Sequence, residues 1–267
     1  MKLMKLIPIA LFASFTFTSC VEKNDIITDD TISSDVVQKI SKLGFSTHDI
    51  KKDEDGGYIV EGDILLHDHD LDRVLDGKVL RVAEAEQYHT TLLVTGSPRV
   101  ITISISNRLP SSYVGALDEA IRRYNAENLS LSFQRVSSGA DISIVKGNGS
   151  FLASAGFPTS TGNPFNQVKV NSGAIGNGTS VTFTNYVATI LAHEIGHCIG
   201  FRHTDYMGRQ YSCGGSPVNE GASTVGAIQI PGTPSGPDAG SWMLACIGSN
   251  QSRLFNSNDK VALNFLY

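Results

Sequence analysis

Residues 193–203 read HEIGHCIGFRH and place three histidines and one glutamate at spacings that suit a zinc ion. On a helix, His193 and His197 lie four residues apart on one face, so both can bind one ion. Glu194 is expected to lie beside the metal and to act as a general base rather than a ligand. Gly200 can adopt a positive φ and end the helix, which lets His203 return as the third ligand. Three protein ligands leave one zinc position open, which predicts catalysis.

The full pattern is far more specific than its first half. A bare HExxH is expected by chance in roughly one in a hundred chains of this length. Requiring glycine and histidine at two further fixed positions lowers that chance to about one in a hundred thousand. The alternative is an amphipathic helix whose histidines are buried and hydrogen-bonded without a metal. The spacing therefore favours a zinc site.

The first 20 residues predict export from the cytoplasm. Lys2 and Lys5 precede a largely apolar run over residues 6–17, and Thr18 and Ser19 place small side chains before Cys20. This arrangement resembles the lipobox of a bacterial lipoprotein signal, although Phe17 stands where Leu or Val is usual. An ordinary secretory signal and a transmembrane anchor are the alternatives, and the apolar run is short for a bilayer. We expect a signal peptide over residues 1–19, a lipid on Cys20, and an outer-membrane or surface lipoprotein of the cell envelope, or a protein secreted after processing.

Composition supports a secreted enzyme and argues against nucleic acid as a partner. A chain of 267 residues with 41% hydrophobic and 18% charged residues can build a full core. Cleavage before Cys20 removes two of the 21 basic residues and none of the 26 acidic ones, which leaves a net charge of −7. So acidic a chain is poorly suited to phosphate backbones. Since no other stretch approaches transmembrane length, a lipid on Cys20 would be the only membrane attachment.

Charge also divides the chain into two parts. Residues 21–86 hold 17 acidic and 8 basic residues, a net charge of −9, whereas residues 87–267 hold 9 acidic and 11 basic residues, a net charge of +2. We place the boundary near residues 87–98. The prediction is an acidic segment over residues 20–95, which could be a propeptide, and a catalytic domain over residues 96–267.

Hydrophobic periodicity predicts an α+β fold. In the acidic segment, apolar spacing predicts a helix over residues 34–43, and residues 58–66 are typical of a strand. In the catalytic domain, we expect strands over residues 99–106, 129–136, 140–146 and 167–171, an edge strand within 151–157, and helices that begin at Ser111 or Ser112, near Thr184 and at Asn258. This order implies a twisted mixed sheet that carries two long helices, one of them the zinc helix, followed by a C-terminal helix.

A long loop and three cysteines lie beyond the zinc motif. Residues 214–241 contain 7 glycines and 4 prolines, too many for regular elements, and a loop of this length is usually functional or disordered. In an oxidising compartment we expect two of Cys198, Cys213 and Cys246 to pair, and the sequence does not say which two. A cysteine ligand to the metal is the alternative, which three histidines make unnecessary.

The HExxHxxGxxH motif resembles that of the metzincin zinc peptidases, and the literal HEIGH of residues 193–197 is similar to the dual-action HEIGH metallopeptidases, over about Arg99 to Tyr267. The resemblance implies a metzincin-like zinc peptidase domain, a protein or peptide substrate, and a zinc cofactor. It implies His193, His197 and His203 as ligands, Glu194 as the base, and Met243 as the methionine of a Met-turn beneath the metal.

Several nearby residues carry further expectations from this resemblance. Met207 is the alternative methionine, but it lies too close to His203 for the chain to pass under the site. Asp205 matches an acidic position that can hold the ligand loop in place. Relatives place a tyrosine two residues after the methionine to stabilise the oxyanion, and here that residue is Ala245. Zinc alone, Tyr206 or Tyr211 would then have to stabilise the oxyanion.

The acidic segment offers two candidates for a latency switch that occupies the open zinc position. These are the charged run from His67 to Asp70, for which a solvated loop is the plainer interpretation, and Asp63. His48 and His89 are expected on the surface. Substrate is expected to pair with the edge strand, provisionally Leu152 to Gly156, with the pocket beyond the scissile bond shaped by residues 214–247.

The function predicted from these residues is zinc-dependent endopeptidase activity at or outside the cell surface. Two alternatives stay open. One is a surface-attached binding or adhesion protein with a structural zinc, although no fourth local ligand closes the site. The other is a zinc hydrolase of a non-peptide bond.

Overall fold

The computed structural model describes residues 32–72, 87–221, 226–234 and 236–267. The described residues all belong to one compact unit that runs from Ile32 to Tyr267. The predicted signal peptide and Cys20 lie outside the described residues. The predicted division near residue 95 stays a prediction.

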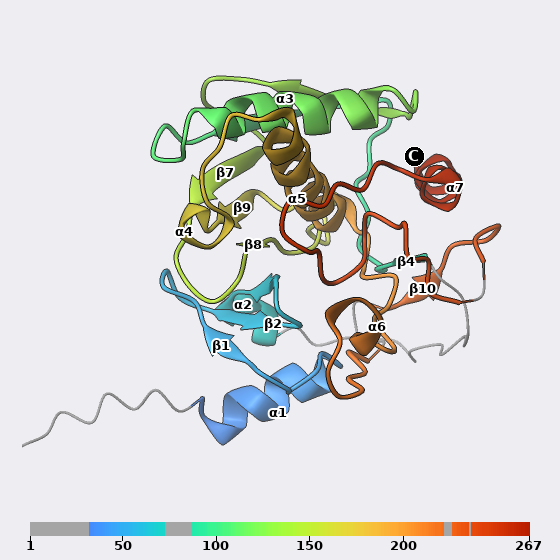
Figure 1. The fold of residues 1–267 in the computed structure, drawn as a ribbon. Helices are drawn as coiled ribbons and strands as arrows, with labels where there is room; N and C mark the ends of the chain where they lie inside the picture. The colour runs from blue at the N-terminus through green and yellow to red at the C-terminus, as the bar shows by residue number, and fades with distance from the viewer. Residues whose placement is uncertain (1–31, 73–86, 222–225, 235) are drawn as a thin grey trace, which may run out of the picture. The chain divides into compact units, whose positions relative to one another are not determined.

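A five-stranded mixed sheet forms the framework of residues 96–267, as predicted (Figure 1). Its order is β6-β5-β7-β9-β8, with β5, β6, β7 and β9 parallel and β8 antiparallel at one edge. The strands are β5 (Arg99–Ile105), β6 (Leu131–Arg135), β7 (Ile142–Lys146), β8 (Ala153–Ser154) and β9 (Gln167–Val170). Alternation in β5 buries Ile101 and Ile103, which is the pattern of a strand with one face on the core.

Two long helices, α3 (Ser112–Asn125) and α5 (Val181–Ile199), pack against each other (Figure 1). Tyr124 of α3 donates a hydrogen bond of 2.7 Å to the carbonyl of Ala192 in α5. Helix α5 begins three residues earlier than Thr184, because Ser180 caps it by accepting a hydrogen bond from the Phe183 amide. The packing of α3 on α5 fixes the direction of α5, the helix that carries the HEIGH residues.

The acidic segment folds into a small α+β body, as predicted, but residues 58–66 are not one strand. They form a hairpin of β2 (Tyr58–Val60) and β3 (Ile64–Leu66), and β1 (Lys51–Lys52) pairs with β2. Glu61 and Gly62 adopt φ of 54° and 92°, so the chain reverses between the two strands. The reversal leaves Asp63 at the end of the turn. Helices α1 (Ser34–Lys42) and α2 (Asp68–Leu71) complete this segment.

The remaining elements are short. Helix α7 (Ser257–Leu266) begins one residue before Asn258, because Asn256 caps it in a capping box with Asp259. The glycine-rich loop contains β10 (Ile228–Gln229), which pairs with β4 (Tyr88–His89). Two single-turn helices, α4 (Ser172–Ile175) and α6 (Gln210–Cys213), were not predicted. Within the described residues, no helix is both long enough and apolar enough to cross a bilayer.

Candidate metal centre

The end of α5 and the turn after it bring the three motif histidines together. Gly200 ends the helix with φ 113°, and its amide donates to the carbonyls of Gly196 and His197. A Cβ at Gly200 would lie 2.6 Å from the carbonyl oxygen of Leu92, so only glycine fits this turn. The chain therefore turns back at once, and His203 approaches the two helical histidines.

The three imidazoles direct their Nε2 atoms at one point. His197 Nε2 lies 3.0 Å from His193 Nε2 and 3.2 Å from His203 Nε2. Each Nδ1 has its own acceptor, which is the Trp242 carbonyl for His193, the Phe201 carbonyl for His197 and the Glu220 carboxylate for His203. When Nδ1 carries the proton, Nε2 is left with a lone pair facing the centre, as metal binding requires. Burial and the neighbouring imidazoles hold the pKa of His197 well below its usual value, which also favours the neutral form.

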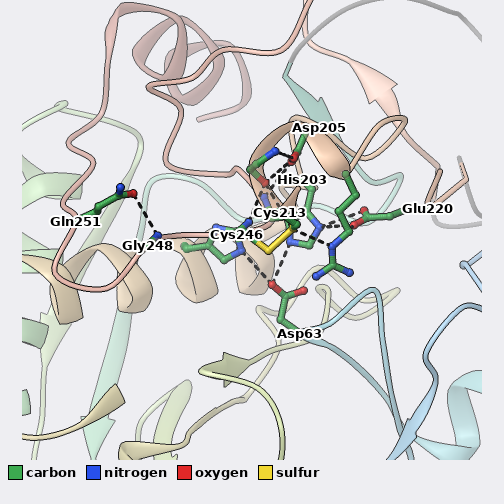
Figure 2. The surroundings of a disulfide bond; sticks show 12 residues. Asp63, His203, Asp205, Cys213, Glu220, Cys246, Gly248 and Gln251 are labelled. Atoms are coloured by element: carbon green, nitrogen blue, oxygen red, sulfur yellow. Dashed lines mark hydrogen bonds and ion pairs between the residues drawn. A yellow bond between two sulfur atoms is a disulfide. The ribbon is translucent and has the colours of Figure 1, made fainter. Parts of the chain in front are cut away.

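Asp63 completes the group from the acidic segment (Figure 2). Its Oδ2 lies 3.1 Å from His203 Nε2 and 3.5 Å from His193 Nε2. One ligand atom from each of Asp63, His193, His197 and His203 lies within 4.8 Å of every other, and all four residues are buried. Three imidazole nitrogens and one carboxylate oxygen are a donor set of tetrahedral zinc, so the residues present fit this ion.

Glu194 lies next to this group without belonging to it. It is 3% exposed, and its Oε2 has no hydrogen-bond partner among the described residues. Burial, and then the charge of Asp63, raise the pKa of the Glu194 carboxyl well above its usual value. A buried carboxyl of high proton affinity beside a metal position is suited to take up and release a proton.

Glu220 is a part of the site that the sequence analysis missed. Its carboxylate accepts the Nδ1–H of His203 at 3.0 Å, and its side chain is fully buried. No spacing relates it to the motif, because it lies 17 residues after His203 in the glycine-rich loop. The available signal was its acidic side chain, which it shares with Asp238, in a loop that was expected to shape the pocket.

Replacing Glu220 with glutamine is expected to weaken zinc binding by about 10- to 100-fold, since a carboxylate that accepts the Nδ1–H of a histidine ligand orients the ring and raises its basicity. Competition against a chromophoric chelator measures this affinity. Asp238→Asn is the control, because Asp238 lies in the same loop and contacts Asn256 and Asn258 instead. Equal zinc affinity in the two variants would show that Glu220 does not support His203.

The Met243 turn lies directly against the HEIGH run. Met243 and Trp242 are buried, and the Met243 carbonyl accepts a hydrogen bond from the Thr204 amide at 3.0 Å. A Cβ at Gly196 would lie 2.6 Å from Met243 Sδ. The glycine of HEIGH thus lets this turn approach the helix. Met207, the alternative methionine, is 41% exposed.

Gly196→Ala is therefore expected to destabilise the protein by about 2 kcal/mol through overpacking, despite the helix propensity of alanine. The matched control is Gly115→Ala in α3, where a Cβ meets nothing within 4 Å. That control should stabilise the chain by up to about 1 kcal/mol. Urea unfolding of both variants tests the difference. Two variants of equal stability would contradict the packing argument.

Asp205 holds the ligand loop in the manner expected (Figure 2). Its Oδ1 accepts from the Ala245 amide at 2.9 Å, and its Oδ2 accepts from the Ser212 hydroxyl at 2.6 Å. A disulfide joins Cys213 to Cys246 in the same region, so two of the three cysteines pair, and Cys198 is free and buried. These links tie the His203 loop to the segment after Met243.

Some sequence expectations fail at the site. Tyr206 is buried against the ring of Tyr88 and Tyr211 is 47% exposed, and an oxyanion role for either tyrosine stays a prediction. His67 caps the one-turn helix α2, so the charged run is not a loop, and the run contributes nothing to the metal group. His89 is half-buried in β4 rather than on the surface, whereas His48 is exposed as expected.

The edge strand already has a partner from the acidic segment. The Ala155 amide donates to the Asp63 carbonyl at 3.0 Å, and the Leu65 amide donates to the Ala155 carbonyl at 2.8 Å. Residues 63–65 therefore extend the sheet beyond β8. This is the edge where sequence analysis placed the substrate.

Comparisons with known proteins agree with the HEIGH resemblance. The profile of a family described as "Dual-action HEIGH metallo-peptidase" matches residues 58–267, and so begins well before Arg99, in the β2–β3 hairpin that carries Asp63. No curated protein matches the chain.

Several solved structures resemble parts of the chain. A myroilysin structure has 17% identity and a TM-score of 0.32, with 41% of this chain and 52% of that chain covered. High choriolytic enzyme 1, a hatching enzyme zinc-protease from the medaka fish Oryzias latipes, has 22% identity and a TM-score of 0.30, with 42% and 50% covered. A second myroilysin structure has 15% identity and a TM-score of 0.39, with 70% and 95% covered. The chain thus spans about half the length of the first two.

Proposed function

Because the chain belongs to the dual-action HEIGH metallo-peptidase family, we propose that it is a zinc endopeptidase in a latent form, with Asp63 in the position that catalysis needs open. The observation that carries this proposal is the group of Asp63, His193, His197 and His203, in which an acidic-segment carboxylate joins the three motif histidines. Three protein ligands are typical of catalytic zinc, and a fourth closes the site.

The pairing of residues 63–65 with Ala155 supports the same proposal. An extended peptide that adds to a sheet edge is held by backbone hydrogen bonds, which suits substrates of varied sequence. The acidic segment uses these hydrogen bonds itself, so a substrate has to displace it. Both the metal position and the substrate edge are blocked by residues 63–65.

Buried charges fasten the acidic segment to the rest of the chain. Glu61 accepts from Arg202 at 2.8 Å, with both side chains 1% exposed. Lys169 of β9 makes ion pairs with Asp53 and Asp55. Breaking a buried pair by removing one partner is costly, so the segment is not expected to leave spontaneously. Release of the segment by cleavage is the simplest route to activity.

In the released enzyme, each motif residue has a defined task. The three histidines would hold zinc, which would supply a Lewis acid to the peptide carbonyl and to the water that attacks it. Glu194 would take a proton from this water as its oxygen bonds to the carbonyl carbon, and would return the proton to the amine nitrogen as the C–N bond breaks. Asp205 and Glu220 keep His203 and its loop in place. The products are two peptides.

The protein is proposed to work outside the cytoplasm, as a lipoprotein anchored through Cys20 or as a secreted protein. The Cys213–Cys246 disulfide supports this, since such bonds persist in oxidising compartments. Protein or peptide is the proposed substrate.

Removal of the metal tests the proposed function. The full chain, activated by limited proteolysis, is expected to cleave an unfolded protein such as casein, to lose essentially all cleavage with a chelator, and to regain it with about one equivalent of zinc. Cleavage that persists in the chelator after full metal removal would contradict a zinc peptidase.

A further inference from the structure

A cavity of about 320 Å³ opens beside Glu194 and His193. Its wall is formed by α5 residues, by the segment that follows Met243 and by Arg253, which precedes α7. A side chain of the substrate next to the scissile bond is the group that would enter such a cavity. The charge in its wall therefore bears on which side chain is accepted.

Arg253 is held rigidly at this wall. Its amide donates to Thr189 Oγ1 at 3.1 Å, and its carbonyl accepts from Arg123 at 3.3 Å. Its guanidinium Nη1 donates to the carbonyl of Cys246, a disulfide-bonded residue, at 2.9 Å. The backbone and the guanidinium are thus fixed on α5 and on the segment after Met243, which is the preorganisation that a specificity residue needs.

The charge of Arg253 lacks a carboxylate partner. Among the described residues, its guanidinium donates to a carbonyl rather than to a carboxylate, and the residue is half-buried. Burial lowers its pKa, and Asp205 and Asp259 compensate only from a distance. A desolvated guanidinium that has no carboxylate partner is a strong hydrogen-bond donor. It can bind the carboxylate of a ligand through two parallel hydrogen bonds.

Release of the acidic segment makes the cavity more cationic. Asp49, Lys51 and Asp63 line it in the latent chain and leave with the segment. The charged lining that remains is Arg209, Arg253 and Glu194. Arg209 is near Glu220, at 3.7 Å, so Arg253 is the cation available to a ligand.

We propose that Arg253 makes this enzyme select substrates with an aspartate or glutamate side chain next to the scissile bond. The proposal rests on the peptidase function above. It assigns the substrate class from the charge of the cavity wall.

Cleavage-site mapping tests the proposal. A peptide library is digested with the chain after limited proteolysis has released the acidic segment, and the cut sites are read by mass spectrometry. Aspartate and glutamate are expected to be enriched about tenfold at one position next to the cut. Arg253→Gln should remove the enrichment while cuts beside alanine continue, and Arg253→Lys should restore part of it. Arg135→Gln, on the exposed end of β6, is the control and should keep it.

Binding to the zinc-loaded Glu194→Gln chain, released from the acidic segment by the same limited proteolysis, decides the question independently of cleavage. By calorimetry, a short peptide with aspartate at the selected position should bind about tenfold more tightly than its asparagine analogue, and Arg253→Gln should abolish the difference. Equal binding of the two peptides, or acidic enrichment that survives in Arg253→Gln, would overturn the assignment of Arg253. If none of these chains cleaves any peptide but the aspartate peptide still binds more tightly than its asparagine analogue, the peptidase function is contradicted. The assignment of Arg253 as the binding residue is then retained.

Discussion

The full-length Asp63→Ala chain is expected to cleave peptides about tenfold or more faster than the unprocessed wild-type chain. The change removes the carboxylate that joins the three histidines in the metal group of the described residues, so the fourth ligand position becomes available to solvent and substrate. The rest of the acidic segment still pairs with Ala155, so proteolytic release should raise the rate further. Initial rates on a quenched fluorescent peptide, compared at equal zinc content, measure the effect.

Asp68→Ala is the matched control for Asp63, because it removes an exposed carboxylate from the same segment. It should leave the full-length chain as slow as the wild type. Asp63→Asn should also activate, since an amide is a weak zinc ligand in place of a carboxylate. If Asp63→Ala is no faster than Asp68→Ala at equal zinc content, Asp63 is not the latency switch.

Glu194→Gln is expected to lower the rate of peptide cleavage by about 10²- to 10⁴-fold, because the variant cannot accept the proton that the reaction releases. The measurement is made in the Asp63→Ala background, where the metal position is accessible. Zinc content should stay at that of the parent, since Glu194 does not belong to the metal group. A variant that keeps zinc but loses cleavage would show that Glu194 acts as the general base and not as a zinc ligand.

Glu127→Gln is the control for this change, because Glu127 pairs with Lys260 in an ion pair remote from the motif. Its rate should match that of the Asp63→Ala parent. A Glu194→Gln variant with full activity would reject Glu194 as the base, whatever its burial.

The order of the long elements was predictable because their patterns are local. The alternation of Ile101, Ile103 and Ile105 predicts β5, and the apolar stripe from Val114 to Tyr124 predicts α3. The hairpin at residues 58–66 was missed because both strands are short and apolar, and the prediction placed the three residues between them, Glu61 to Asp63, in the same strand. A glycine at positive φ changed one strand into two and carried Asp63 towards the histidines.

The motif histidines could be predicted for the same reason, since helix geometry relates His193 to His197 and Gly200 brings in His203. Long-range partners could not. Glu220 and Asp63 reach His203 from 17 and 140 residues away, so no local spacing connects them. The role of Gly196 also needed the structure, because the close approach of Met243 is a property of packing.

X-ray absorption at the zinc edge of the full-length chain tests whether Asp63 and the three histidines bind one zinc ion together. We expect one zinc per chain, surrounded by nitrogen from three imidazoles and oxygen from one carboxylate, and the carboxylate contribution should disappear in Asp63→Ala. Three results would contradict zinc binding by these four residues. They are a chain that binds no zinc, a zinc ion bound to the sulfur of Cys198, and a set of zinc-binding atoms that is the same in Asp63→Ala as in the wild type.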